Sequence, residues 1–207
     1  MSVIAIYKKI GETPLEALTR LRESIPEYKE ETLSYAGRLD PMASGVMLVL
    51  VGDANKEREK YLNLNKDYSA EILFGVSTDT YDILGLISAV ITESLNGEYI
   101  EEELKVKMRG LKGTFSQKYP EYSSKPVDGQ PLFMHARAGK RVAVPTHDVT
   151  IYDVSLTSVK TIDSEELLSR IESQVALVKG DFRQEDIVSM WKEKLLQSEI
   201  KQFVVAE

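Results

Sequence analysis

The order of apolar and polar positions at the start of the chain predicts a strand, a turn and a helix. Residues 3–7 are rich in β-favouring side chains. Thr13-Pro14 then begins a stretch whose apolar residues recur at helical spacing, with proline at the first helical position, where it is well tolerated. The apolar positions of this stretch are Leu15, Leu18, Leu21 and Ile25. We therefore expect an amphipathic helix from Pro14 onward.

The next apolar run covers residues 43–51, and its pattern fits a buried strand or part of a helix equally well. Residues 57–63 have a helical pattern, whereas residues 68–74 alternate as a strand. A second β-rich run at residues 83–91 follows the acidic loop at residues 78–82. We expect these two strands to pair antiparallel around the loop.

The second half of the chain continues as a mixture of helices and strands. Its predicted elements are a helix at 100–109 that ends at Gly110, a strand at 149–154, helices at 163–178 and 184–196, and a strand at 200–205. A loop-rich segment that contains Pro120, Pro126 and Pro131 separates the first helix from the strand that follows. Lys179-Gly180-Asp181 breaks the helical pair. The expected fold class is therefore α+β, with strands concentrated in the first 155 residues.

Composition excludes several kinds of chemistry. The chain has 207 residues, no cysteine and two histidines, His135 and His147, so a disulfide framework, a thiol nucleophile and a cysteine-based zinc site are excluded. The longest apolar run, residues 46–51, is far shorter than the roughly 20 residues of a membrane-spanning helix, and the N-terminus has no secretion-signal pattern. We expect an intracellular, cytoplasmic protein whose chemistry comes from carboxylates, hydroxyls, amines or phenols.

Charge is unevenly distributed along the chain. The formal net charge is −7, yet residues 105–141 contain nine basic and two acidic residues. This segment also holds the aromatic residues Phe115, Tyr119, Tyr122 and Phe133. Such a composition is typical of a surface that holds a phosphate backbone and stacks bases. A solvated basic face on an acidic protein has the same composition, and composition by itself favours that simpler interpretation.

The segment most informative about chemistry is residues 35–45. Its carboxylate, Asp40, is followed by Pro41, which fixes its own φ and biases Asp40 away from a helix. Gly37 and Gly45 frame the segment and permit close approach of the backbone to a ligand. Local chemistry by itself favours an ordinary Asp-Pro turn, because a catalytic carboxylate normally needs a partner and none is adjacent to Asp40.

The same segment resembles the catalytic loop of the TruB family of tRNA pseudouridine synthases, whose pattern is Gly-x-Leu-Asp-Pro followed by a small residue and glycine. The matching residues here are Gly37-Arg38-Leu39-Asp40-Pro41 and Ala43-Ser44-Gly45. Three other blocks resemble family motifs and follow one another in the same order as in the family. The first is residues 7–14, with Lys9 replacing the usual proline. The second comprises Lys66-Asp67-Tyr68, Gly75, residues 78–82 and Gly85, and the third comprises Tyr122-Ser123-Ser124, Gly129, Phe133 and Ala136-Arg137, leading to the strand at 149–152. The resemblance covers roughly residues 4–155.

The resemblance implies a fold, an activity and a partner. The fold is a mixed, largely antiparallel sheet core of the pseudouridine synthase type with flanking helices, forming a single catalytic domain over residues 1–207. Residues 161–197 would be a helical insertion, and no PUA-type C-terminal domain is expected. The activity is isomerisation of the T-loop uridine of tRNA (position 55) to pseudouridine, with no metal and no cofactor. The partner is the T-arm of tRNA, bound by a monomer.

The resemblance also implies roles for individual residues. Asp40 matches the essential aspartate, which attacks the sugar or base covalently or removes a ribose proton; the sequence leaves these routes open. Tyr68 matches a tyrosine that stacks under the target base, although a strand aromatic that fills the core fits the composition equally well. The matching RNA-binding candidates are Tyr35, Gly37, Arg38, Tyr122, Lys125 and Arg137. Arg137 fits a buried structural cation equally well, and Asp79 and Asp82 are assigned to loop architecture.

Three departures from the family pattern affect these expectations. Tyr35 stands where the family has histidine, and Arg38 replaces a small residue.

The family's Lys-Gly-Thr-Tyr-Ile-Arg motif, whose arginine pairs with the catalytic aspartate, has two possible placements in this chain. Residues 179–183 resemble it loosely, with Arg183 one residue early; alternatively, the strand at 200–205 leads into a motif that lies beyond the chain. The sequence favours the second placement, which makes a non-catalytic or truncated tRNA-binding module the alternative function.

Overall fold

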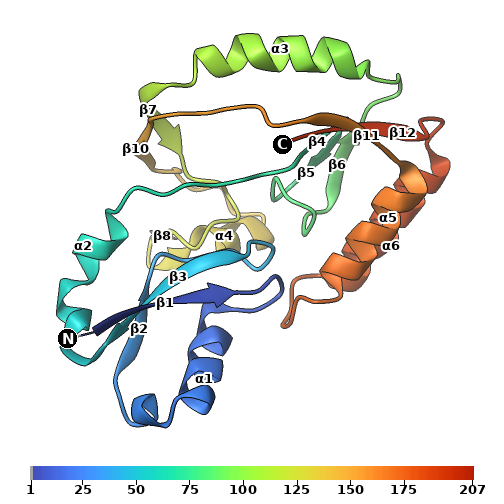
Figure 1. The fold of residues 1–207 in the computed structure, drawn as a ribbon. Coiled ribbons are helices and arrows are strands. Elements are labelled where there is room, and N and C mark those ends of the chain that lie inside the picture. The colour runs from blue at the N-terminus through green and yellow to red at the C-terminus, as the bar shows by residue number, and fades with distance from the viewer. Residues whose placement is uncertain (1) are drawn as a thin grey trace. The chain divides into compact units, whose positions relative to one another are not determined.

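The computed structural model describes residues 2–207, which form two compact units. The first unit contains the chain up to Tyr68 together with Arg170–Gln184, and the second contains Ser69–Ser169 and Glu185–Glu207. Figure 1 shows the order of the elements. No helix within residues 2–207 has the length and apolar character needed to cross a membrane.

The first unit is built on a three-stranded antiparallel sheet with the order β1-β3-β2 (Figure 1). Its strands are β1 (Ser2–Lys8), β2 (Leu33–Ala36) and β3 (Gly45–Val51). The apolar run at residues 43–51, which the sequence left open, therefore forms a strand. Because β3 is central and contributes buried side chains to hydrophobic clusters on both faces, its sequence shows little alternation.

Helices cover the two faces of this sheet. Helix α1 (Pro14–Ser24) begins with a capping box between Thr13 and Glu16, as the Thr-Pro start predicted. Its buried residues form one cluster with alternate residues of β3: Ala17, Leu18, Leu21, Met47, Val49 and Val51. A 3-10 helix, η2 (Gly52–Glu57), and helix α2 (Arg58–Leu62) contribute to the second cluster, around Leu50. A short 3-10 helix, η1 (Pro26–Tyr28), follows α1.

The second unit contains four small antiparallel sheets, with the orders β11-β12-β4, β5-β6, β7-β10 and β8-β9. The strands are β4 (Ile72–Phe74), β5 (Val76–Thr78), β6 (Ile87–Val90), β7 (Gly113–Lys118), β8 (Pro126–Val127), β9 (Gln130–Pro131), β10 (Thr146–Ile151), β11 (Val159–Asp163) and β12 (Gln202–Ala206). This mixed, largely antiparallel arrangement confirms the predicted α+β class.

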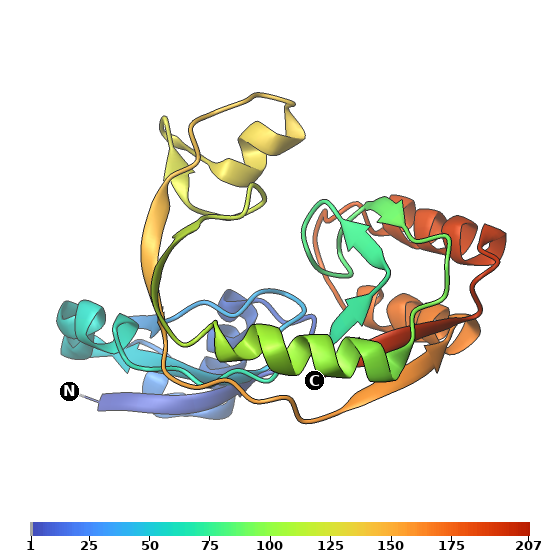
Figure 2. The same cartoon turned by 90° about the horizontal axis from the view of Figure 1, so that it is seen from above.

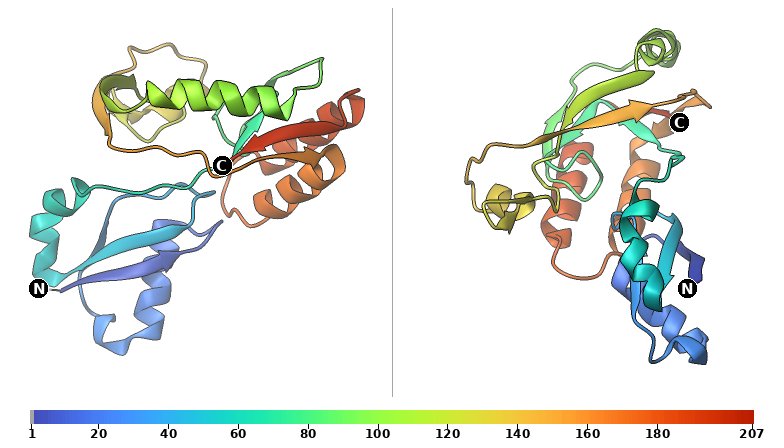
Figure 3. Two further views of the ribbon diagram at one scale, coloured as in Figure 1. Left: turned by 45° about the horizontal axis from the view of Figure 1, so that its top comes forward. Right: turned by 90° about the vertical axis from the view of Figure 1, so that its left-hand side faces the viewer.

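The remaining helices are α3 (Gly97–Arg109), α4 (Leu132–Arg137), α5 (Ser164–Val175) and α6 (Gln184–Gln197). Helix α3 ends at Gly110, as predicted, and runs along β11 and β12 (Figures 2 and 3). The predicted break between the last two helices is confirmed, since α5 ends before and α6 begins after residues 179–181.

The structure corrects several strand predictions. Residues 68–71 precede β4 instead of belonging to it, and β4 pairs with the C-terminal β12, while the hairpin around the acidic loop is formed by β5 and β6. Strand β7 lies where a loop was expected, and β11 was not predicted. Every residue of β7 is exposed, so the strand carries no alternation of buried and exposed positions that a sequence pattern could reveal.

Candidate functional site

Asp40 lies on the loop that joins β2 to β3. Gly37 and Gly45 bound this loop with φ values of +85° and +148°, a backbone region that residues with side chains rarely adopt. A Cβ atom at either glycine would meet no other atom within 4 Å, so backbone conformation, not tight packing, requires glycine here. Asp40 itself is exposed, and its carbonyl oxygen accepts a hydrogen bond from the Ala43 amide at 3.0 Å. The loop thus presents the Asp40 carboxylate to solvent.

Two residues of the N-terminal block hold this loop in place. Lys8 is fully buried, and its Nζ donates hydrogen bonds to the carbonyl oxygens of Ala43 at 2.6 Å and Lys9 at 3.0 Å. The Gly11 amide donates to the Pro41 carbonyl oxygen at 2.8 Å. The backbone that follows Asp40 is therefore tied to the β1–α1 turn at two points.

Lys8 also acts on Asp40 electrostatically. Burial lowers the pKa of the Lys8 ammonium, and the carboxylates of Glu12, Asp40 and Glu16 oppose this by raising it. The Lys8 ammonium and the Asp40 carboxylate therefore attract each other. A carboxylate on an exposed loop can act as a nucleophile or as a general base.

The other predicted residues of this unit have different environments. Tyr35 packs partly into the cluster formed by α1 and β3, and its carbonyl oxygen accepts a hydrogen bond from Arg58 Nε at 3.1 Å. Arg38 is exposed two positions before Asp40. Tyr68 is 78% exposed and lies outside any strand, so the alternative of a strand aromatic that fills the core is wrong.

The turn before α6 carries Arg183. The Gln184 side chain clamps this turn: Nε2 donates to the carbonyl oxygens of Val178 at 3.0 Å and Gly180 at 2.8 Å, and Oε1 accepts from the Phe182 amide at 2.9 Å. Arg183 has a φ of +63° and a buried Nε atom. Arg183 and Asp40 belong to the same compact unit.

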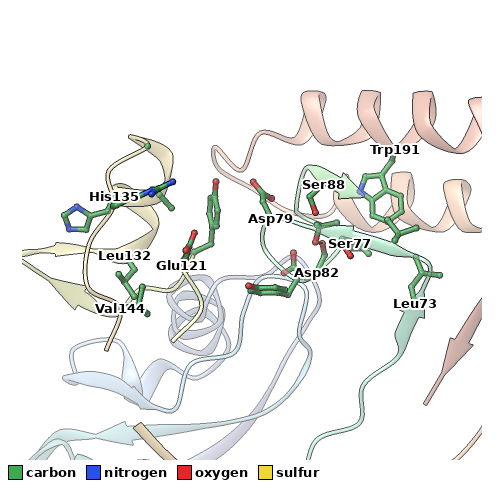
Figure 4. Close-up of a pocket in the computed structure, with 18 of the residues that line it drawn as sticks. Leu73, Ser77, Asp79, Asp82, Ser88, Glu121, Leu132, His135, Val144 and Trp191 are labelled. Atoms are coloured by element: carbon green, nitrogen blue, oxygen red, sulfur yellow. Dashed lines mark hydrogen bonds between the residues drawn. The ribbon is translucent and has the colours of Figure 1, made fainter. Parts of the chain in front are cut away.

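The second unit contains a cavity of about 1140 Å³, shown in Figure 4. Asp79 and Asp82 lie on the loop between β5 and β6, with His135 and Leu132 on one side of them and Ser77 and Trp191 on the other. The lining residues include carboxylates and cations: Glu71, Asp79, Asp82, Glu121, Lys140 and Arg141. The cavity is therefore polar and carries both signs of charge.

The two aspartates of the acidic loop stabilise its backbone. Asp79 Oδ1 accepts a hydrogen bond from the Leu86 amide at 2.8 Å, and Asp82 Oδ1 accepts from the Leu84 amide at 2.9 Å and from Thr80 Oγ1 at 2.6 Å. These bonds agree with the architectural role that the sequence predicted for Asp79 and Asp82.

Of the predicted RNA-binding residues in the basic segment, Tyr122 lines the cavity, whereas Lys125 and Arg137 are outside its lining. Lys125 Nζ lies 5.0 Å from the ring centroid of Tyr119, which itself stacks on His147 at a centroid distance of 4.2 Å. Arg137 is exposed, with its guanidinium carbon 5.9 Å from the Phe133 ring centroid. The alternative of a buried structural cation at Arg137 is therefore wrong.

Two further residues, Lys8 and Tyr81, have environments that the sequence did not predict. Lys8 belongs to the N-terminal block at residues 7–14, but no local signal marks it as buried. Tyr81 lies in the acidic loop with a φ of +65° and 80% of its surface exposed. Within residues 2–207, no group of three or more His, Asp or Glu side chains is arranged to hold a metal ion.

The fold and site define a mixed α+β protein with an aspartate-bearing loop held between antiparallel strands. A profile of the family described as "TruB family pseudouridylate synthase (N terminal domain)" matches residues 27–182. The chain belongs to this family.

Curated relatives support the same assignment. The chain is similar to proteins named "tRNA pseudouridine synthase B": 33% identical to that of Limosilactobacillus reuteri over 180 residues, 34% to that of Bacillus subtilis over 156 residues, and 30% to that of Aquifex aeolicus over 171 residues. These alignments cover 87%, 75% and 82% of this chain, and 58%, 49% and 57% of the respective relatives. The chain thus spans about half to three fifths of the length of these relatives.

Proposed function

We propose that the chain is an RNA pseudouridine synthase that isomerises the T-loop uridine of tRNA (position 55), with Asp40 as its catalytic carboxylate. The observation that carries the proposal is the exposed Asp40 on a loop tied to Lys8 and Gly11, in a chain of the TruB family. We further propose that residues 1–207 act as one catalytic domain and as a monomer in the cytoplasm. The partner is the T-arm of tRNA, and the reaction uses no metal or cofactor.

The chemistry requires little more than one ionised carboxylate. The N-glycosidic bond between N1 and the ribose breaks, the uracil turns, and a bond between C5 and the ribose forms as C5 loses a proton and N1 gains one. Asp40 either attacks the sugar or base covalently or removes a ribose proton, and both routes need its ionised form. Lys8 contributes by holding the loop that carries Asp40, through its hydrogen bond to the Ala43 carbonyl oxygen.

The substrate base must leave its stack to reach Asp40, as in other enzymes that act on a base. We assign to Tyr68 the stacking role under this base, a role that its 78% exposure supports. The proposed RNA contacts are Tyr35, Gly37, Arg38, Tyr122, Lys125 and Arg137. The exposure of Arg38, Lys125 and Arg137 supports contact with phosphates.

Although the sequence favours a motif arginine beyond the chain, we propose the other placement, with Arg183 as the cationic partner of Asp40. Two observations support it: Arg183 shares a compact unit with Asp40, and the Gln184 clamp holds the turn that carries it. Arg183→Gln in the assay below is expected to lose most of the activity. Activity equal to that of the wild type would exclude this assignment and leave the proposal for Asp40 intact.

The experiment is a tritium-release assay on tRNA labelled at uridine C5, with wild type beside Asp40→Asn. Asp53→Asn is a matched control, because Asp53 is an exposed carboxylate of the same unit with a surface ion pair to Lys56. Wild type and Asp53→Asn should release tritium, and Asp40→Asn should be slower by about 10²-fold or more with an unchanged unfolding temperature. Release by Asp40→Asn at the wild-type rate would contradict the proposal. Salt-sensitive tRNA binding by a wild type that releases nothing would favour the non-catalytic RNA-binding module.

A further inference from the structure

The loop between β5 and β6 is held by contacts within itself. Besides the bonds of Asp79 and Asp82, Thr78 Oγ1 donates a hydrogen bond to the Asp82 carbonyl oxygen at 2.8 Å. Gly85 is closely surrounded, since a Cβ atom there would lie 2.4 Å from Thr80 Oγ1 and 2.6 Å from Thr78 Cβ. A loop with this many internal bonds and so little free space has one preferred conformation.

Tyr81 lies in this loop in a conformation that does not suit its residue type. Its φ of +65° is in the left-handed region, where glycine and asparagine are common and a bulky residue is an outlier. Its side chain is 80% exposed, so burial in a core does not explain the tyrosine. Some residues keep an unfavourable backbone conformation because the structure around them is well determined. Such residues are found most often at binding sites.

Tyr81 also lines the cavity of the second unit, together with Tyr122, Lys140 and Arg141. Trp191 lines it too; its side chain is 1% exposed, and its Nε1 finds no hydrogen-bond partner among residues 2–207. Proteins commonly bind an unpaired nucleotide with an aromatic ring and nearby cations. The ring stacks on the base, and the cations contact the phosphates.

We propose that Tyr81 is a stacking platform for an unstacked RNA base, and that Lys140 and Arg141 contact the phosphates beside that base. The inference rests on one part of the proposed function, namely that the chain binds RNA. Because the loop fixes the backbone at Tyr81 before RNA arrives, less conformational entropy is lost when the base stacks than on a mobile loop. Lys140 and Arg141 are both exposed and open to a phosphate.

The test is binding of a fluorescently labelled T-arm stem–loop RNA, followed by anisotropy, to the full chain. Tyr81→Ala should weaken Kd by about 5- to 100-fold, the range expected when one base–aromatic stack is lost, while Tyr81→Phe should keep the wild-type Kd. Tyr99→Ala is the matched control, because Tyr99 is 64% exposed in the same unit and does not line the cavity. Trp191 is the only tryptophan, so a change in its emission on RNA binding reports directly on the cavity.

A second variant separates stacking from a structural role. Tyr81→Gly relieves the left-handed backbone, so it should keep or raise the unfolding temperature while weakening RNA binding as much as Tyr81→Ala. An unchanged Kd for both variants, or an equal loss for Tyr99→Ala, would overturn the inference. If the wild type releases tritium and Tyr81→Ala binds the RNA with the wild-type Kd, the stacking platform is rejected and the proposed synthase activity is retained. Tyr81-dependent binding without tritium release would reject the synthase and retain the platform.

Discussion

A Cβ atom on Gly11 would lie 2.3 Å from the carbonyl oxygen of Leu177, so the turn after β1 touches the backbone that follows α5. The same Gly11 donates its amide hydrogen to Pro41, next to Asp40. A second link joins these segments, since Lys179 Nζ lies 3.1 Å from Glu16 Oε1, and Glu16 completes the capping box of α1. The segment after α5 therefore supports the Asp40 loop through Gly11.

Gly11→Ala should destabilise the protein and slow its reaction. The new methyl group would overlap the Leu177 backbone, and the φ of +79° at Gly11 is itself unfavourable for alanine. We expect a loss of at least about 2–4 kcal/mol in the free energy of unfolding, and a lower rate of tritium release because Pro41 loses its anchor. Urea denaturation and single-turnover kinetics measure the two effects.

Gly129→Ala is the control for Gly11→Ala. Gly129 has the same φ of +79°, but a Cβ atom there would meet nothing within 4 Å. Its substitution should cost only the backbone strain of about 1–2 kcal/mol. Equal losses for the two variants would show that the contact with Leu177 carries no additional energy.

Lys8→Met should reduce activity more than stability. The substitution removes the donor to the Ala43 carbonyl oxygen and a cation that acts on Asp40, while it also removes the cost of a buried charge. We expect the rate of tritium release to fall about 10- to 100-fold through misplacement of the carboxylate, with the KM for tRNA unchanged. Lys9→Met, at the exposed neighbouring lysine, should leave both parameters at wild-type values. A raised KM with an unchanged rate would contradict a positioning role for Lys8.

Acid should weaken the link between α1 and β1. Hydrogen bonds from the Arg20 side chain, at 2.8 and 3.0 Å, are the largest cause of a lowered pKa at Glu12, and Arg20 also donates to the Tyr7 carbonyl oxygen. Because the pKa of Glu12 is lower in the folded state, its carboxylate stabilises the fold at pH values above 4.5, its ordinary pKa. This stabilisation is lost as the pH falls through the lowered pKa.

Glu12→Gln tests this pH dependence by urea denaturation. The wild type should be more stable than Glu12→Gln by about 1 kcal/mol near neutral pH, and the difference should shrink toward zero in acid. Glu23→Gln, at an exposed glutamate of α1, is the control and should show no such change. A difference between wild type and Glu12→Gln that stays constant with pH would exclude the Glu12–Arg20 pair as its source.

Local signals in the sequence determined the elements whose formation depends on neighbouring residues. The Thr13-Pro14 start of α1, the end of α3 at Gly110 and the break at residues 179–181 agree with the structure. The glycines around Asp40 were also identified from the sequence, because a positive φ is a property of one residue. These features require no knowledge of distant contacts.

Tertiary structure alone decided the features that depend on segments far apart in the chain. The pairing of β4 with the C-terminal β12, the burial of Lys8 beneath the Asp40 loop and the contact between Gly11 and Leu177 have no local signature. Even the apolar run of β3 became a strand only by its central place in a sheet covered on both faces. Strand pairing and burial are set by which surfaces meet in the folded chain, whereas helix caps and turns are set by the dihedral angles and hydrogen bonds of adjacent residues.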